Sequence, residues 1–402
     1  MIKTIKIFAA VCLFVVTCNV SKAQNTTVTL QQAINTVVKN YPVMEAARLG
    51  VEKQKAVKKT AVDLGTTTVY TGVEEVGNGS LGIKNNIGIS QSDIDVFSIA
   101  AKSNLAKAEI KKAEIKLNLT QAELERTVSG LYYNAVIAKQ QWLLYKAIDT
   151  LYAGFEKAAK LKFDLQQTSQ IEYLSASAKN KQMKINIKKA ESDYKAALQL
   201  LNQYLFINTL FDIDEKGVIA NAYKPATTGD SAKHGVLLSY YSAETEIAEK
   251  QWKTQKAGYL PKLNLEYANQ SIDGASGFYA WQVGVSVPLL FFAQSGKTKA
   301  AKLDYNIAEK QFEQKKLEIN AQYNQLLSRY MVLKDVLNYY EKEAVPLSKK
   351  QISATTLAYK LGNIDYVQFI QNVETSINTN LEFLKQQAEF LQLSVWLKYL
   401  SL

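Results

Sequence analysis

The alternation of apolar and polar residues is strictest between residues 259 and 288, where two short segments flank a polar loop. In both segments the apolar side chains fall on odd-numbered positions, which include Leu263, Leu265, Trp281, Val283, Val285 and Val287. A period of two predicts β-strands with one apolar and one polar face. A single hairpin of this kind is not stable alone, so the rest of the sequence must supply a partner for it.

Most of the remaining chain has the pattern of long helices. Predicted helices cover residues 98–164 and 171–204 in the first half, and residues 293–359 and 365–399 in the second half. At ~1.5 Å per residue, the longest of these would extend on the order of 100 Å. A helix of that length implies coiled-coil-like packing against its neighbours.

The two halves of the chain repeat each other. A shift of 196 residues places Ile-Gly-Ile-Ser at 87–90 on Val-Gly-Val-Ser at 283–286. The first half therefore contains a second hairpin, at residues 66–91, and Ile87 and Ile89 share the face of the apolar side chains in the first. An internal repeat of this kind identifies an architecture before any single element does.

The repeat divides the chain into three parts after residues 1–23. We assign residues 24–206 to the first repeat, 207–233 to a central linker, and 234–402 to the second repeat. Four strands cannot close a barrel, and an open sheet edge is not viable in lipid. Symmetric assembly is the simplest closure, and three chains would supply twelve strands, although the alternation itself does not set the number of copies.

The first 23 residues have the pattern of an export signal. A basic start and an apolar run precede Ser21-Lys22-Ala23, which predicts a secretory signal peptide cleaved after Ala23. Lipid attachment at Cys18 is the alternative, but the threonine before it fits that signal poorly. Cleavage after Ala23 would remove both cysteines of the chain, and with them any disulfide or thiolate metal site.

Composition argues against several classes of function. The formal net charge of +11 falls to +8 once the three lysines of residues 1–23 are removed. The remaining lysines alternate with acids, as on solvated helix faces, so we predict no nucleic-acid partner. His234 is the only histidine, and no catalytic or metal-binding motif occurs, so we predict no enzymatic activity, no cofactor and no bound metal.

At this point the sequence resembles the TolC-like outer membrane efflux proteins, across essentially the whole mature chain. The most specific pieces of the resemblance are Tyr259-Leu260-Pro261 entering a strand, Pro288 with Leu289 and Phe291 leaving one, and Pro346 followed by Tyr359 and Gly362. The resemblance implies a mainly α fold with membrane β-structure. It implies a homotrimer with a twelve-stranded barrel in the outer membrane, and a long α-helical tunnel that extends into the periplasm.

The resemblance also implies the positions of functional residues. An inner-membrane pump and a periplasmic adaptor would dock on the helical tips, where the candidate contacts are Leu165, Gln166, Thr168, Leu361, Gly362 and Asn363. The family's acidic positions at the periplasmic aperture fall here on Gln368 and Gln371, neither of which is acidic. Asp365 and Glu172 are the nearest carboxylates, with Ser175 as a further candidate, and Asp365 is also well placed as a helix N-cap.

The leading functional hypothesis is a passive exit duct in the outer membrane for small molecules or ions. In that case the odd-numbered apolar face, from Ile87 and Ile89 to Val287, contacts lipid. A channel for type I protein secretion would have the same fold and is one alternative. A periplasmic coiled-coil scaffold or adaptor is another, although it would not need paired hairpins with an apolar face.

Overall fold

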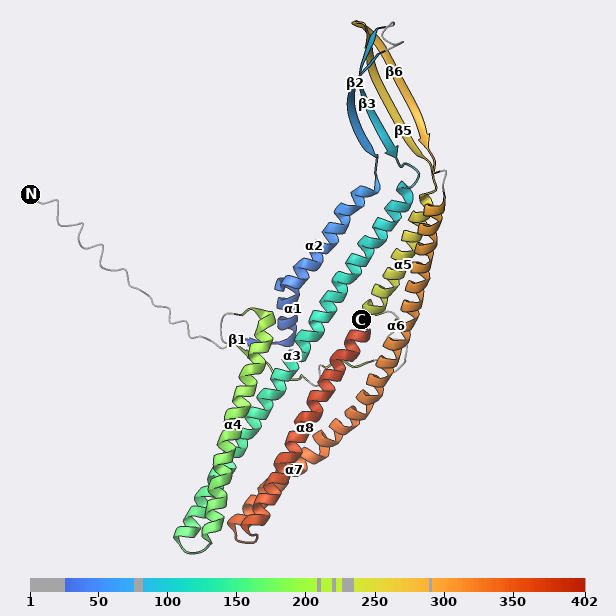
Figure 1. The fold of residues 1–402 in the computed structure, drawn as a ribbon. Coiled ribbons are helices and arrows are strands. Elements are labelled where there is room, and N and C mark those ends of the chain that lie inside the picture. The colour runs from blue at the N-terminus through green and yellow to red at the C-terminus, as the bar shows by residue number, and fades with distance from the viewer. Residues whose placement is uncertain are drawn as a thin grey trace, which may run out of the picture.

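The protein is an elongated molecule with a sheet at one end (Figure 1). At the other end, two tight turns each connect a pair of long helices. The structure is a computed structural model, and it describes residues 26–75, 82–207, 211–218, 222–225, 235–288 and 291–401. The predicted signal peptide, the alternative lipid-attachment residue Cys18, and His234 all lie outside the described residues.

The first half of the chain begins in the middle of the molecule, runs to the sheet, and then extends through one long helix to the opposite end (Figure 1). Its elements are β1 (Thr26–Val28), α1 (Leu30–Asn40), α2 (Pro42–Val57), η1 (Lys58–Ala61), β2 (Thr66–Glu75), β3 (Ile83–Ile94), α3 (Ile99–Asp164) and α4 (Gln170–Leu205). Helix α1 starts at a capping box, in which the Thr29 hydroxyl accepts from the Gln32 amide and the Gln32 side chain accepts from the Thr29 amide. Pro42 opens α2, a position where the missing N–H costs nothing.

The second half repeats this order of elements. It comprises β4 (Phe211–Ile213), α5 (Val236–Ala257), β5 (Lys262–Ile272), β6 (Ala275–Ser286), α6 (Phe292–Tyr339), the π-helical segment η3 (Tyr340–Ala344), α7 (Val345–Lys360) and α8 (Tyr366–Ser401). Helix α3 packs along α4, α5 and α8, so the two halves share one core. Tyr132, Tyr323, Leu391 and Leu397 are among its fully buried side chains.

The helix predicted at 293–359 is interrupted by the π-helical segment. Pro346 follows directly, and a proline cannot donate to the carbonyl of Lys342, with which its ring would also clash in a regular helix. A wider turn before a proline is a common way of accommodating this conflict. The chain therefore bends here (Figure 1), although the sequence pattern predicted one uninterrupted helix over residues 293–359.

The two hairpins join in one antiparallel sheet of order β2-β3-β5-β6. The register aligns Val69, Ile89, Tyr267 and Trp281 in one row across the four strands. Strands β2 and β6 form the sheet edges, and each pairs with one strand only among the described residues. The predicted fold class, mainly α with two hairpins in a duplicated plan, is confirmed, and the sheet of the single chain is an open one.

Candidate functional site

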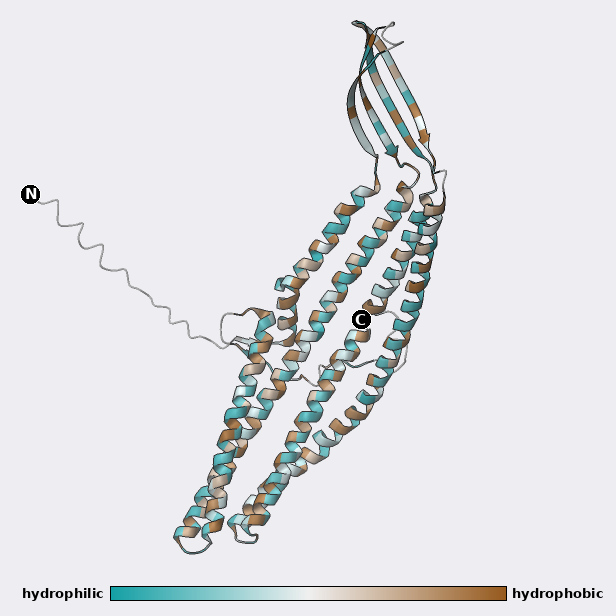
Figure 2. Ribbon diagram, in the orientation of Figure 1, coloured by the Kyte–Doolittle hydropathy of each residue, from teal (hydrophilic) through white to brown (hydrophobic). Residues whose placement is uncertain are grey.

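The apolar face of the sheet is the first candidate functional surface. Ile87, Trp281, Val283 and Val285 are 59–71% exposed, because no other described part of the chain covers this face. Ile89, Leu265 and Val287 are also exposed, and Leu263 is half-buried. Hydropathy alternates along these strands (Figure 2). An apolar patch of this extent on a single chain marks a surface that meets lipid or a partner.

The opposite face of the sheet is polar and carries a cross-strand contact. The Tyr70 hydroxyl donates to Glu266 by passing over Gly88 on the intervening strand. A Cβ atom at Gly88 would lie 2.5 Å from the Tyr70 ring, so only glycine leaves room for this side chain. The two faces of one sheet thus differ sharply in character.

The second candidate is the pair of helical tips, which have the same backbone geometry. The Gln166 amide donates to Phe163 and the Gln167 amide to Lys162, at 2.9 and 2.8 Å. The shift of 196 residues maps this pair of bonds onto the α7–α8 turn, where the amide of Gly362 donates to Tyr359 at 3.1 Å and that of Asn363 to Ala358 at 2.9 Å. Both turns are Schellman motifs that close with a left-handed residue, Gln166 at φ 59° and Gly362 at φ 75°.

The predicted docking residues lie at these turns. Leu165 and Leu361 are 57% and 65% exposed and form the apolar crest of each tip. Gln166, Gly362 and Asn363 are also exposed, whereas Thr168 is half-buried. The tips therefore present a small apolar contact surface framed by polar groups.

Replacing Gly362 with alanine should destabilise the second tip by about 1–2 kcal/mol. The cost comes from backbone strain, because φ at Gly362 is 75°, in the left-handed region that alanine disfavours. A steric clash does not contribute, since a Cβ atom there would meet no atom within 4 Å. Gly154→Ala is the matched control, because Gly154 is also unobstructed but lies inside helix α3, where alanine should stabilise by ~0.5–1 kcal/mol. Amide hydrogen exchange of residues 355–370 measures the first effect, and unchanged exchange there would contradict the left-handed geometry.

A buried cluster joins the two tips to each other. Phe155 of α3, Tyr359 of α7 and Phe369 of α8 pack with ring centroids 4.7–5.2 Å apart. The carboxylate of Glu172, which is only 8% exposed, accepts from the hydroxyls of Tyr359 and Thr168. Burial, with the hydrogen bond to Glu172, raises the pKa of Tyr359 well above its ordinary value, so the phenol remains a donor.

The predicted aperture residues come from α4, from α8 and from the turn before α8. Gln368 and Gln371 are exposed on α8, and Ser175 is half-buried on α4. Asp365 caps α8, because its Oδ1 accepts from the Gln368 amide at 2.8 Å. Glu172 is held inside the tip cluster and does not present a free carboxylate. Its pairing with Tyr359 was not predicted, because no local pattern can indicate a contact between residues 187 positions apart.

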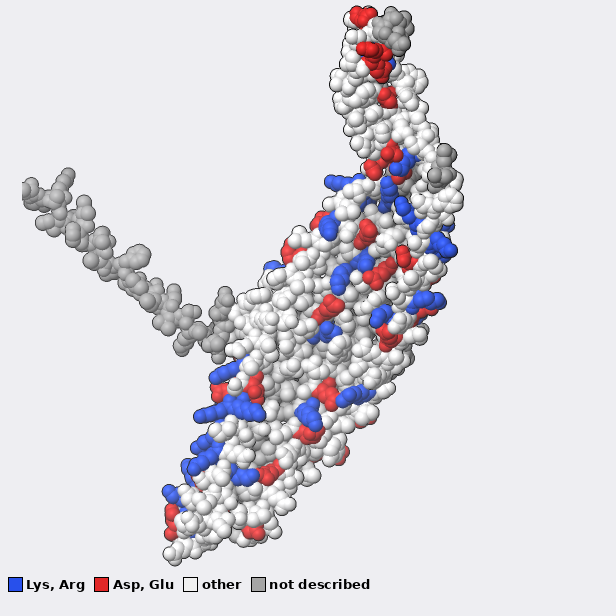
Figure 3. Space-filling model, viewed as in Figure 1, with Lys and Arg blue, Asp and Glu red and all other residues white. Residues whose placement is uncertain are grey.

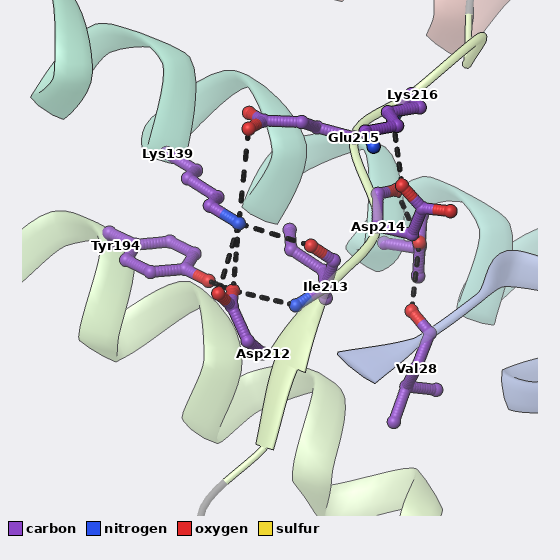
Figure 4. Close-up of polar contacts among 9 residues, drawn as sticks. Val28, Lys139, Tyr194, Asp212, Ile213, Asp214, Glu215 and Lys216 are labelled. Carbon is purple, nitrogen blue, oxygen red and sulfur yellow. Dashed lines mark hydrogen bonds and ion pairs between the residues drawn. The ribbon is translucent and has the colours of Figure 1, made fainter. Parts of the chain in front are cut away.

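A third polar centre lies in the middle of the molecule, where β1 and β4 form a parallel two-stranded sheet. Lys139 of α3 contacts both carboxylate oxygens of Asp212 at 3.0 and 3.1 Å and the Ile213 carbonyl at 3.1 Å (Figure 4). The Tyr194 hydroxyl of α4 also donates to Asp212. Burial raises the pKa of Asp212, but the hydrogen bonds from Tyr194 and Lys139 outweigh burial and hold that pKa below its ordinary value.

This centre attaches the N-terminal strand and part of the central linker to the long helices. The Asp214 amide donates to the Val28 carbonyl at 3.2 Å, and Tyr132 Oη lies 2.7 Å from the Asp214 carbonyl oxygen and 3.0 Å from that of Val28. Burial raises the pKa of Tyr132 to about 12. The polar side chains of this centre bond to backbone carbonyls or to the Lys139–Asp212 ion pair. We therefore interpret the centre as a structural clamp at mid-length of the helices.

Two further features concern membranes and metals. In the part of the chain that the structure describes, no helix combines the length and the apolar character that crossing a bilayer requires. Within the same residues, no three His, Cys, Asp or Glu side chains are grouped as the ligands of a metal would be.

Comparison with known proteins gave matches among solved structures. No protein-family model and no curated protein matches the chain. The structure of CusC is 13% identical with a TM-score of 0.78, over 92% of this chain and 91% of that one. The outer-membrane channel OprN is 14% identical with a TM-score of 0.77, over 92% and 89%. The open state of the MtrE outer membrane channel of Neisseria gonorrhoeae is 15% identical with a TM-score of 0.73, over 92% and 88%.

Each of the three structures matches over 92% of this chain. Their identities are far below the level at which function can be transferred, so they establish the architecture. The chain has the fold of the TolC-type outer membrane channels.

Proposed function

We propose that three copies of this chain form an exit duct through the outer membrane, as part of a tripartite efflux system. The single observation that carries this proposal is the open, one-sided sheet at the end of helices as long as α3, which has 66 residues. Its apolar face has no cover and its two edges have no partners among the described residues. Closure with two further copies would pair both edges, and lipid around the closed sheet would cover the apolar face.

In the closed assembly, the apolar face meets lipid and the polar face lines the duct. Ile87, Trp281, Val283 and Val285 would then lie on the outside. The Tyr70–Glu266 contact would lie on the inside, where water can reach the carboxylate. Twelve strands leave an interior too wide for side chains to fill, so a water-filled path is expected.

The helices would continue this path into the periplasm and end at the tips. We infer that the adaptor and the inner-membrane pump dock at the crests formed by Leu165 and Leu361, because an exposed apolar side chain at an exposed turn is a natural contact residue. Movement of the α7–α8 turn away from the α3–α4 turn would open the duct. Such a movement has to break the Glu172–Tyr359 contact.

Gln368 and Gln371 are the side chains that we propose at the periplasmic aperture. Both are exposed amides on the first turns of α8. Amides present no fixed charge, so the aperture of this chain should not concentrate cations as a ring of carboxylates would. The duct would be passive, and the pump would select and drive the cargo.

Fractionation of cells that express the full-length chain tests the proposal. The protein should be recovered from outer-membrane fractions and should migrate in detergent as a trimer, by light scattering coupled to size-exclusion chromatography. Recovery as a soluble periplasmic monomer would overturn the proposal and would favour the scaffold alternative.

A further inference from the structure

Exposed apolar residues gather at the four junctions between strands and helices. Each strand begins or ends beside at least one of them, and their exposed fractions run from 42% to 86%: Val62, Leu64, Phe97, Leu260, Phe291 and Phe292. Phe292 is the most exposed at 86%, although it occupies the first turn of α6. These side chains extend the apolar surface of the sheet as far as the border between the sheet and the helices. The apolar surface ends at this border.

Lysines follow directly on the helical side of this border. Six of them form no ion pair with any described residue, and together we name them the lysine collar: Lys58, Lys59, Lys256, Lys297, Lys299 and Lys302. Lys256 and Lys302 lie over the Trp252 ring, 4.1 and 4.2 Å from its centroid, so this part of the collar is held in place. The first turn of α6 contains no acidic residue.

The junctions as a whole are strongly basic. Residues 56–65, 91–103, 255–264 and 291–303 contain eight lysines and three aspartates, a net charge of +5 for each chain. The three aspartates do not neutralise the collar, because they pair with other lysines. Asp93 pairs with Lys262 at 3.3 Å, whereas Asp63 and Asp95 pair with Lys102 at 3.9 and 2.8 Å. Three copies in the proposed assembly would carry a ring of about eighteen collar lysines.

The opposite end of the same sheet has the opposite sign. This end carries three acidic residues and one lysine, which are Glu74, Glu75, Asp273 and Lys84. Glu74 pairs with Lys84 at 3.2 Å. In the space-filling view, acidic side chains mark the far end of the sheet, and basic ones gather where it meets the helices, with some acidic ones among them (Figure 3). The basic charge is therefore specific to one border of the apolar surface.

We propose that the lysine collar binds the head groups of anionic phospholipids in the periplasmic leaflet of the outer membrane. Apolar side chains followed by lysines are the arrangement of an interfacial anchor, in which the rings enter the acyl boundary and the ammonium groups reach phosphates. Lys297 lies five residues after the first residue of α6, about 8 Å along the helix axis, which is comparable to a head-group layer of roughly 5–8 Å. The inference rests on the proposed outer-membrane location.

The geometry favours phospholipid over lipopolysaccharide as the lipid whose phosphates meet the lysine collar. Both carry phosphate, but lipopolysaccharide occupies the outer leaflet. The collar lies on the helical side of the sheet, which faces the periplasm in the proposed orientation. The far end of the sheet, which would meet lipopolysaccharide, is acidic at Glu74, Glu75 and Asp273 and lacks such a cluster of lysines among the described residues.

Thermal stability of the detergent-solubilised full-length trimer, measured against dioleoylphosphatidylglycerol concentration, tests the inference. The test variant is K58Q/K59Q/K297Q/K299Q. The matched control is K188Q/K189Q/K349Q/K350Q, which removes the same charge from exposed lysines far from the sheet. In the test variant, the apparent affinity for this lipid should fall by roughly fivefold for each lysine removed at low salt. The control should keep the wild-type affinity, and dioleoylphosphatidylethanolamine should bind weakly to all three proteins.

Each other outcome overturns the inference in a recognisable way. Equal losses in both variants would show a general effect of charge, and unchanged binding in the test variant would show that the collar is not a lipid site. Binding of lipid A that depends on the same four lysines would contradict the assignment to the periplasmic leaflet. The trimer itself would still form in each of these cases, whereas failure of the proposed function would remove the trimer from the outer-membrane fraction.

Discussion

Val283→Arg should prevent stable assembly in the outer membrane. Val283 lies on the apolar face of β6, opposite Leu265 and three residues before the end of the strand, and is 59% exposed in the single chain. An arginine that faces lipid near the bilayer midplane costs about 2–4 kcal/mol. Each trimer would carry three such charges. The yield of trimer in outer-membrane fractions, measured on non-reducing gels without heating, should fall at least tenfold.

Two neighbouring substitutions act as controls for depth and for face. Gln282→Arg places the same charge on the polar face, opposite Glu266, and should leave the trimer yield near the wild-type level. Val285→Arg lies one residue from the end of β6, where the cost of a lipid-facing charge falls towards 0–1 kcal/mol, so its effect should be intermediate. A yield that is lower for Gln282→Arg than for Val283→Arg would mean that the even-numbered face meets the lipid.

Tyr359→Phe should loosen the joint between the two helical tips. The substitution keeps the ring in contact with Phe155 and Phe369 but removes the hydroxyl that donates to the buried Glu172. Loss of a hydrogen bond to a charged group costs about 1.5–3 kcal/mol, which corresponds to roughly ten- to hundredfold faster local opening. Hydrogen exchange of residues 160–175 and 355–370 measures that rate. A higher ionic conductance of the trimer in planar bilayers should accompany it.

Two further variants separate the hydrogen bond from the packing. Tyr152→Phe is the matched control, since Tyr152 is buried in the same cluster and its hydroxyl makes no hydrogen bond to a described residue. It should exchange like the wild type. Adding Glu172→Gln to Tyr359→Phe should recover part of the loss, because the buried group then carries no charge. No difference between Tyr359→Phe and Tyr152→Phe would show that the Glu172 contact does not hold the tips together.

The fold was predictable because its main signals are local and occur twice. Alternation over a few residues predicted the two hairpins but not the short strands β1 and β4. The observed register places Trp281 beside Tyr267 and Ile89, as shared parity requires. Uninterrupted helical periodicity predicted α3 to within one residue at its start. The repeat then linked the two hairpins, and β3 does pair with β5.

The features that the sequence analysis missed depend on contacts between distant residues. Glu172 was predicted as a candidate at the aperture, and its contacts with Tyr359 and Thr168 inside the tip were not predicted. No pattern at residue 172 reports what lies 187 positions later. Lys139 likewise meets Asp212 across 73 residues. The left-handed Gln166 was also unexpected, since glutamine gives no sign of it, although its repeat partner Gly362 does.

Disulfide cross-linking between the two sheet edges tests most directly whether copies of the chain close the sheet into a barrel. Thr68→Cys on β2 would be combined in turn with a cysteine at Phe278, Ala280, Gln282 or Gly284 of β6, because both sets lie on the polar face. Within one chain the two edges are three strand spacings apart, about 14 Å, which exceeds the Cα separation of roughly 4.4–6.8 Å that a disulfide allows. Any bond must therefore join different copies.

The mature chain predicted here has no cysteine of its own, so the engineered pair is the sole source of cross-links. In protein extracted from the outer membrane, at least one of the four pairs should give a covalent trimer that reverts to monomer on reduction. Absence of cross-links for all four pairs, or cross-linked species that stop at dimers, would contradict closure of the sheet by three copies.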